Sequence, residues 1–304
     1  MVSTTRSLTR RLGIGALTAM ATVGALGGPA LAGPTPYPSA KPKQTQTSPA
    51  KPRTKIGNIG YQVVVGNWVI ADAGGFVRVA ADCPAGMQVL SGGEENTISG
   101  GVVLTVSYPE SPTRWTSFAA NTSSGTASVR GYAVCGSGIS GHQIVTNDFN
   151  VGGNSSIGFA GTCPQGKLAL GGGESNSNPN GGLRIGSSFN PPTSGGSYFW
   201  GVDVVNTSLI TQNWRLFTMC GGGLSRYQRV QGPDVNLPAG GFGSASATCP
   251  DGMVALGGGG LNASRGEAVL TDSFPTGDGR GWSVYSKNIS NDGSHVHVDV
   301  VCGA

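Results

Sequence analysis

The sequence predicts an all-β protein made of three similar antiparallel units, each closed by one disulfide. Three observations support this: Gly makes up 53 of 304 residues, short runs of alternating apolar residues are frequent, and one phrase occurs three times. The phrase reads CPAGMQVLSGGE from Cys83, CPQGKLALGGGE from Cys163 and CPDGMVALGGGG from Cys249. Abundant Gly with β-branched runs is typical of short strands joined by turns. Repetition at a nearly fixed period indicates repeated structural units.

Residues 1–32 have the features of a secretory signal peptide. Basic residues, including the pair Arg10-Arg11, precede a weakly apolar stretch, and Ala30-Leu31-Ala32 forms an A-x-A cleavage site. The arginine pair suits the twin-arginine route, whereas Gly13 suits general secretion, so both routes stay open. No later apolar run reaches the roughly 18–20 residues of a membrane helix. We therefore expect a secreted, extracellular protein without a membrane span.

Residues 33–57 are expected to form a disordered tether, because the stretch is rich in Pro and Lys and contains no acid. Eight of the 19 Lys and Arg residues lie in the first 55 positions. The remaining 11 face all 15 Asp and Glu residues, so the part after residue 55 has a net charge near −4. This balance disfavours nucleic acid as a partner of the folded part.

The repetition extends beyond the phrase and defines repeat 1 (58–137), repeat 2 (138–222) and repeat 3 (223–304). The first cysteines of the three copies are 80 and 86 residues apart. In every copy a Trp lies 20 positions, and an Asn 14 positions, before a closing Cys. The positions that recur in this way are Trp115, Trp200 and Trp282; Asn121, Asn206 and Asn288; and Cys135, Cys220 and Cys302. A Ser also recurs 24 or 25 residues after the first cysteine, at Ser107, Ser188 and Ser273.

Alternation within each repeat predicts about six short antiparallel strands. In HVHVDVVC, which ends at Cys302, the valines share one face with the cysteine, whereas His295, His297 and Asp299 share the other. Such a strand is half-buried and points its cysteine into the core. The Gly pairs and triplets after the repeated Leu positions indicate a bulge or a close approach of two backbones.

Six cysteines in an exported chain predict disulfides, with 15 possible pairings. The repetition favours one bond within each repeat, and each bond is expected to contribute about 3–4 kcal/mol. These bonds would be Cys83–Cys135, Cys163–Cys220 and Cys249–Cys302. The alternative is a ring of bonds between neighbouring repeats, starting with Cys135–Cys163.

The joints between the repeats are only a few residues long, as in GSGIS after Cys135. Neighbouring repeats must therefore touch. This favours one body with approximate three-fold symmetry over three separate beads.

No arrangement of titratable residues in the sequence predicts catalysis, so we do not expect an enzyme. His295 and His297 have a spacing that suits a metal, but the other repeats place Ser128 and Arg130, or Asn213 and Arg215, at these positions. The sequence contains no G-x-S-x-G, H-E-x-x-H or P-loop motif. All cysteines are assigned to disulfides. We expect neither a metal nor a cofactor.

The recurring polar and aromatic residues are the candidates for a ligand site. An aromatic ring beside amide and hydroxyl groups suits a neutral sugar, which stacks on the ring and forms hydrogen bonds at its rim. The candidates are Trp115, Trp200, Trp282, Asn121, Asn206, Asn288, Glu94 and Glu174. Competing interpretations place the tryptophans in the core, the asparagines in hairpin turns, and the glutamates in turns or salt bridges.

The pattern C-P-x-G-x(4)-G-G-G, followed by Ser, Trp, Asn and a closing Cys-Gly, resembles repeats in secreted actinobacterial proteins. It is also similar to modules of pilus tips and phage tail fibres, which implies adhesion. The pattern covers all three copies. A weaker likeness links the chain to three-fold β-prism proteins, which include lectins and an egg vitelline-membrane protein. Their repeats are shorter than these.

The sequence therefore predicts a secreted, non-catalytic binding protein with repeated lectin-like modules. The expected ligand is a carbohydrate or another polymer of a cell surface or cell wall, because several weak sites together raise avidity. The alternative is a structural component of an extracellular coat, filament tip or matrix that binds a protein partner. Exposed tryptophans would favour a sugar, and buried tryptophans beside a large apolar patch would favour a protein.

Overall fold

The computed structural model describes residues 54–180, 182–191, 198–263 and 265–304 of the chain. This part contains 21 strands and no helix, which confirms the all-β class. No helix capable of crossing a membrane is present among these residues. The expected signal peptide (1–32) and the expected tether up to residue 53 lie outside the described residues.

The strands of the three repeats follow one another along the chain as follows. Repeat 1 and the residues before it hold β1 (Thr54–Ile56), β2 (Ile59–Val65), β3 (Val69–Ala71), β4 (Phe76–Asp82), β5 (Gln88–Asn96), β6 (Val102–Ser111), β7 (Arg114–Asn121) and β8 (Ala127–Ser137). Repeat 2 holds β9 (Ser140–Val151), β10 (Ser155–Thr162), β11 (Leu168–Asn176), β12 (Leu183–Phe189), β13 (Phe199–Asn206) and β14 (Gln212–Gly222). Repeat 3 holds β15 (Tyr227–Gln231), β16 (Val235–Leu237), β17 (Phe242–Thr248), β18 (Val254–Asn262), β19 (Ala268–Pro275), β20 (Gly281–Asn288) and β21 (Ser294–Gly303).

Strand β1 corrects the expected end of the tether at residue 57. It pairs with β2 in a tight hairpin, in which Ile56 lies opposite Ile59. Gly57 occupies the turn with a φ of 55°, a left-handed conformation that suits Gly. Ile59 is buried in the core, so the hairpin is anchored by apolar burial that the Pro- and Lys-rich composition does not reveal.

Each repeat contains two three-stranded sets that pair in the same manner. The first, last and third strand positions form one set: β2 and β3 with β8 and β5, β9 with β14 and β11, and β15 and β16 with β21 and β18. The second, fifth and fourth form the other: β4–β7–β6, β10–β13–β12 and β17–β20–β19. All these pairings are antiparallel. The apolar faces of the strands supply the hydrophobic core.

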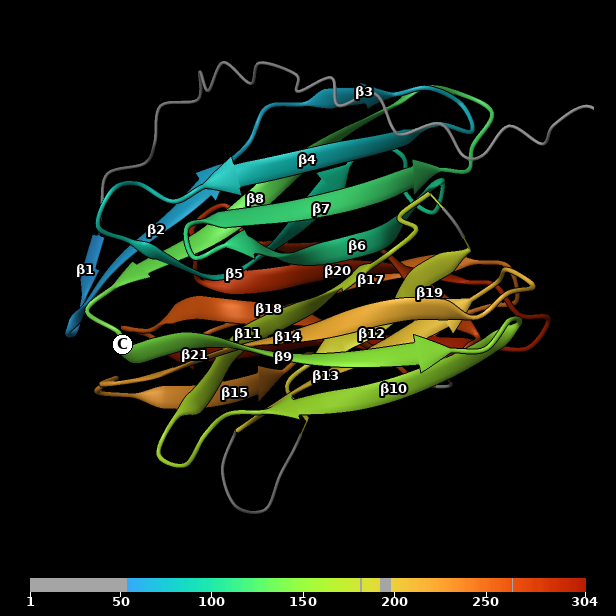
Figure 1. The fold of residues 1–304 in the computed structure, drawn as a ribbon. Coiled ribbons are helices and arrows are strands. Elements are labelled where there is room, and N and C mark those ends of the chain that lie inside the picture. Colours follow the sequence, from blue (N-terminus) through green and yellow to red (C-terminus); the bar gives the residue numbers. More distant parts are fainter. Residues whose placement is uncertain (1–53, 181, 192–197, 264) are drawn as a thin grey trace, which may run out of the picture. The chain divides into compact units, whose positions relative to one another are not determined.

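Three junctions join the third strand of one repeat to the fourth strand of another. The paired residues at the first two are Ser107 with Glu174, which joins β6 to β11, and Ser273 with Glu94, which joins β19 to β5. At the third place β18 meets β12, where the backbone N–H of Asn262 donates to the Ser187 Oγ at 3.1 Å. The first junction produces a continuous six-stranded sheet, β4–β7–β6–β11–β14–β9, whose strands cross the front of the molecule in Figure 1. Every repeat thus contacts both others.

The repeated Gly-rich phrase lies where β5, β11 and β18 approach one another. A Cβ on Gly171 would lie 2.5 Å from the Leu90 carbonyl oxygen, and one on Gly257 would lie 2.4 Å from that of Leu170. Ser91 occupies the corresponding position in repeat 1 and is fully buried. Glycine is therefore needed in repeats 2 and 3, where a Cβ would meet the backbone of a neighbouring repeat.

The three disulfides join Cys83 to Cys135, Cys163 to Cys220 and Cys249 to Cys302, which confirms the predicted pairing within each repeat. The described residues include no free cysteine. Each bond connects the segment before the third strand to the last strand of the same repeat, which is the central strand of its three-stranded set.

Candidate functional site

The three repeated tryptophans lie in the core and do not form a sugar-binding surface. Trp115, Trp200 and Trp282 are at most 1% exposed. Each indole N–H donates to the recurring serine of its own repeat, over 2.9 to 3.0 Å. The ligand-stacking role expected of these rings is thus corrected. A buried indole needs a hydrogen-bond acceptor, and the repeated Trp and Ser satisfy this requirement together.

The repeated asparagines are also buried, and they hold the turns that precede the closing strands. The Asn206 amide donates to the carbonyl oxygens of Gly152 and Ile210 at 2.9 and 2.8 Å. Its carbonyl oxygen accepts the backbone N–H and the hydroxyl of Ser208. Asn121 and Asn288 form the same kind of contacts. These asparagines therefore stabilise hairpin turns, and the prediction that they contact a ligand is corrected.

Replacing Asn206 with Ala is expected to destabilise the protein by about 1–3 kcal/mol, because several buried backbone groups would lose their partner. Urea unfolding of the oxidised protein measures this change. Asn213→Ala, which removes an exposed Asn side chain of the neighbouring strand, serves as the control. Equal stability of the two variants would contradict the structural role of Asn206.

The two repeated glutamates are fully buried as well. Neither Glu94 nor Glu174 has a hydrogen-bond partner for its carboxylate oxygens among the described residues. Burial raises the pKa of Glu94 well above its ordinary range, and Asp272 and Glu95 raise it further. Burial raises the pKa of Glu174 well above its ordinary range, and the nearby Asn176 amide offsets part of this shift. Both side chains are shielded from solvent, so the ligand contacts expected of them are corrected too.

His297 and His142 contact different partners. His297 Nδ1 is 3.0 Å from Asp234 Oδ1, and His142 Nε2 is 2.9 Å from the Val89 carbonyl oxygen. Among the residues that the structure describes, no group of three His, Cys, Asp or Glu is placed to hold a metal ion.

A shallow trough of about 550 Å³ lies on repeat 2, over the end of the set β9–β14–β11. Strand register explains its shape. Ser175, Arg215 and Asp148 stand opposite one another on three adjacent strands, and Asn213 and Asn150 are paired two positions further along. Because side chains alternate between the faces, both rows project to the outside. The row between them, which includes Trp214, forms the floor.

The trough offers amide, hydroxyl and charged groups in a small area. The Arg215 guanidinium contacts the Asp148 carboxylate through two hydrogen bonds of 2.5 and 2.9 Å. Hydrogen bonding to Arg215 lowers the pKa of Asp148, so this carboxylate is charged at neutral pH. Asn150, Asn213 and Arg215 are exposed. Their donors and acceptors are available to a hydroxyl-rich ligand.

Two further aromatic side chains, Phe217 and Tyr108, lie next to the residues that line the trough. Phe217 lies on the outward face of β14, two positions from Arg215, and its ring centroid is 5.4 Å from that of Tyr108 on β6. Tyr108 is half-buried. Burial and the nearby Glu110 carboxylate raise the pKa of the Tyr108 phenol, so it remains a hydrogen-bond donor. Phe217 is only 9% exposed, so the half-buried Tyr108 supplies most of the aromatic surface next to the polar groups.

The positions that form the trough are those at which the repeats differ. The pair Asp148 and Arg215 corresponds to Trp68 and Arg130 in repeat 1, where the guanidinium lies 4.4 Å from the indole centroid. It corresponds to Asp234 and His297 in repeat 3. The alternation of side chains along the last strand of each repeat identifies these outward positions. A search for residues that the repeats share does not find them, because their residues differ.

Sequence reasoning also overlooked an asparagine that recurs in all three repeats. Asn96, Asn176 and Asn262 each lie 13 positions after the first cysteine of their repeat. Each donates its side-chain amide to a backbone carbonyl of a neighbouring repeat, on Thr271, Thr105 and Gly186 respectively. The fixed offset was the available signal, and it marks contacts between the repeats.

The fold is that of an all-β protein with one disulfide in each repeat. The trough lies on the outer face of the six-stranded sheet that repeats 1 and 2 form together. No protein-family model matches the chain, and no curated protein matches its sequence.

Proposed function

We propose that the protein is a secreted, non-catalytic binding protein whose trough on repeat 2 binds a carbohydrate of a cell surface or cell wall. The observation that carries this proposal is the trough itself, where exposed amides, a serine and an arginine–aspartate pair lie beside aromatic side chains. A sugar needs both kinds of surface, because its hydroxyls form hydrogen bonds and its apolar faces stack. Three disulfides are compatible with an extracellular location.

The burial of the recurring residues supports a single main site over three equal ones. The repeated Trp and Asn side chains stabilise the fold, whereas the outward positions carry different chemistry in each repeat. Within the described part of the chain, only repeat 2 combines an exposed Asp–Arg pair with paired asparagines. Avidity from three identical sites is therefore not part of the proposal.

Binding of residues 33–304, with all disulfides formed, to an array of glycans and cell-wall polymers tests the function. We expect clear binding to one class of glycan, weakened about tenfold or more by the double change Asn150→Ala and Asn213→Ala, since each lost hydrogen bond costs about 0.5–1.5 kcal/mol. Asn236→Ala is the matched control, because Asn236 takes the place of Asn150 in repeat 3. Absence of glycan binding, or equal loss in the control, would overturn the proposal.

A second candidate function is that of a structural extracellular protein with a protein partner. Leu209 and Ile210, in the turn held by Asn206, are 85% and 65% exposed. Exposed apolar side chains of this kind favour contact with another protein. The test is the double variant Leu209→Ser and Ile210→Ser, examined for stability and for pull-down of a protein partner. Loss of the partner with unchanged stability would favour this candidate, provided that no glycan on the array binds.

A further inference from the structure

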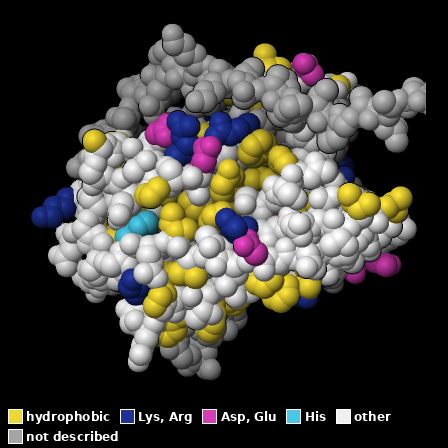
Figure 2. All heavy atoms as spheres, viewed as in Figure 1, with side chains coloured by type: hydrophobic (Ala, Val, Ile, Leu, Met, Phe, Trp, Pro, Cys, Tyr) yellow, Lys and Arg dark blue, Asp and Glu magenta, His cyan; other side chains and the backbone are white. Residues whose placement is uncertain are grey.

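The outward face that holds the trough continues beyond repeat 2. Strand β11 joins β6 through the pairing of Glu174 with Ser107, so the sheet runs on into β6, β7 and β4 of repeat 1. With a strand spacing of about 4.8 Å, six strands present a surface on the order of 24 Å wide. In Figure 2, charged side chains of both signs gather at two places on this face, and hydrophobic side chains lie between them.

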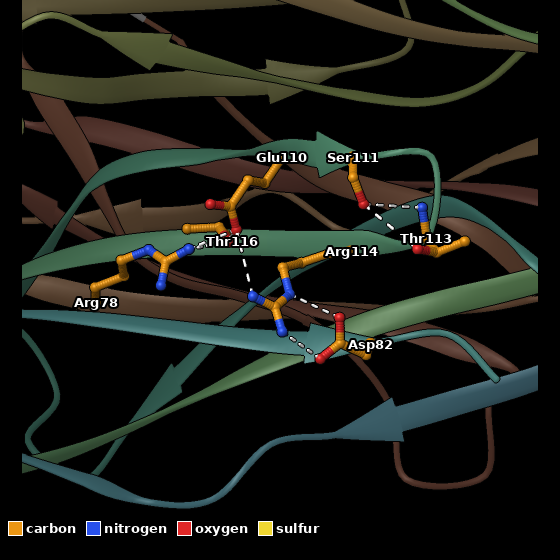
Figure 3. A network of polar contacts seen from close by, with 7 residues as sticks. All are labelled: Arg78, Asp82, Glu110, Ser111, Thr113, Arg114 and Thr116. Carbon is orange, nitrogen blue, oxygen red and sulfur yellow. Dashed lines mark hydrogen bonds and ion pairs between the residues drawn. The ribbon is translucent and has the colours of Figure 1, made fainter. Parts of the chain in front are cut away.

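The far end of this surface is a network of charged and hydroxyl side chains on β4, β6 and β7, which Figure 3 shows from close by. Arg114 holds Asp82 through two hydrogen bonds of 2.6 Å. Arg78 contacts Glu110, and the Thr116 hydroxyl donates to the same carboxylate at 2.8 Å. These ionic side chains are more than a third exposed. The network therefore offers donors and acceptors to a molecule lying on the sheet.

Aromatic side chains fill the interval between the network and the trough. Tyr108 lies on β6 beside the network and contacts Phe217 across the junction. Phe118 is half-buried and lies on the outward face of β7, two positions after Thr116 on the same face. The order along the face is thus polar, aromatic and polar, in a direction that crosses the strands.

The charges on this face cancel in pairs. Each of its arginines contacts a carboxylate: Arg78 contacts Glu110, Arg114 contacts Asp82, and Arg215 contacts Asp148. A strongly anionic or cationic polymer would have to displace one partner from each pair. A hydroxyl group, by contrast, donates to a carboxylate and accepts from a guanidinium without breaking the pair. The balance of charge favours an uncharged ligand.

We propose that the natural ligand is an extended, uncharged polysaccharide chain that lies across all six strands, from the trough on repeat 2 to the network on repeat 1. This proposal rests on the proposed function and specifies its ligand. The aromatic interval would then contact the middle of the chain, and the two polar ends would hold its hydroxyl groups.

Calorimetric titration with two series of neutral oligomers tests this inference. The probes are β-1,4-linked glucose oligomers and N-acetylglucosamine oligomers, each from the mono- to the hexasaccharide. For one of the series we expect affinity to rise at least tenfold between the di- and the hexasaccharide. Changing Arg78 and Glu110 together to Ala keeps the net charge and should remove most of this gain. The control is Arg280→Ala with Asp251→Ala, an exposed ion pair in repeat 3, which should leave the gain intact.

The possible results separate the two proposals. Affinity that does not change with chain length, or an equal loss of the gain in the control, would overturn the extended-chain inference and leave the trough as the binding site. Binding of an anionic polymer such as hyaluronan in preference to both neutral series would also overturn it. Failure of every oligomer and every array glycan to bind would overturn the proposed function itself.

Discussion

Replacing Gly173 with Ala is expected to destabilise the protein severely, by about 3 kcal/mol or more, and to impair its folding. A Cβ at this position would lie 2.0 Å from the carbonyl oxygen of Ser107 and 3.0 Å from its carbonyl carbon. Both atoms belong to the backbone of β6, which cannot move aside as a side chain would. The added methyl group would force β11 away from β6 and open the six-stranded sheet.

Gly93 and Gly259 occupy the same position in the other repeats, where a Cβ would lie 1.7 Å from the Ser273 oxygen and 1.9 Å from the Ser188 oxygen. The same cost is expected at all three junctions. Guanidinium unfolding of each variant measures it. Gly125→Ala is the control, since no atom lies within 4 Å of its Cβ position, and it should change the stability by less than about 1 kcal/mol. Similar midpoints for Gly173→Ala and Gly125→Ala would refute the role of the junction glycines.

The second large effect concerns pH, because Glu174 is buried without a hydrogen-bond partner among the described residues. Loss of hydration raises the pKa of its carboxyl group well above the ordinary value of 4.5. Below that value, both the folded and the unfolded chain carry the proton. Above it, the unfolded chain releases its proton while the folded chain retains it. Stability therefore decreases with rising pH, by about 1.4 kcal/mol per pH unit for this group, until the folded pKa is passed.

Changing Glu174 to Gln removes this ionisation and should flatten the decrease. The measurement is the free energy of unfolding at a series of pH values from about 4.5 to neutrality, with wild type and variant compared under the same salt. The variant should gain over wild type as the pH rises. Asp292→Asn, at an exposed carboxylate, is the control and should follow the wild type. A constant difference between Glu174→Gln and wild type across the range would contradict the assignment. Glu94 is expected to behave similarly, although Asp272 and Glu95 complicate its titration.

The sequence was most informative where the repeats share residues, and these residues hold the fold. The offsets of the cysteines led to the correct disulfides, because one spacing recurred three times. The Trp positions were equally visible, but their partners were not. Ser188 accepts the Trp200 indole N–H from another strand of the same set, and such a contact depends on strand register.

The residues of the trough differ from repeat to repeat, which is why sequence reasoning selected buried residues instead. Repetition draws attention to positions with the same requirement in every copy, and a buried Asn turn is such a position. The trough consists of outward positions such as Arg215, where each copy differs. Its neighbour Tyr108 comes from another repeat, so only the three-dimensional arrangement places it beside Phe217.

The junction between β5 and β19 has a consequence for how the chain is made. The backbone N–H of Asn96 donates to the carboxylate of Asp272, which is 176 positions further along the chain. The edge strand β5 of repeat 1 is therefore covered only after repeat 3 has been synthesised. Until the third repeat has folded, β5 presents open backbone groups that can pair with another chain. In the folded protein each third strand is joined to the fourth strand of another repeat, at β5–β19, β11–β6 and β18–β12, so a fourth copy would find no free third strand to join. Three repeats therefore complete a cycle of junctions, and this geometry fixes the number of copies that the fold accommodates.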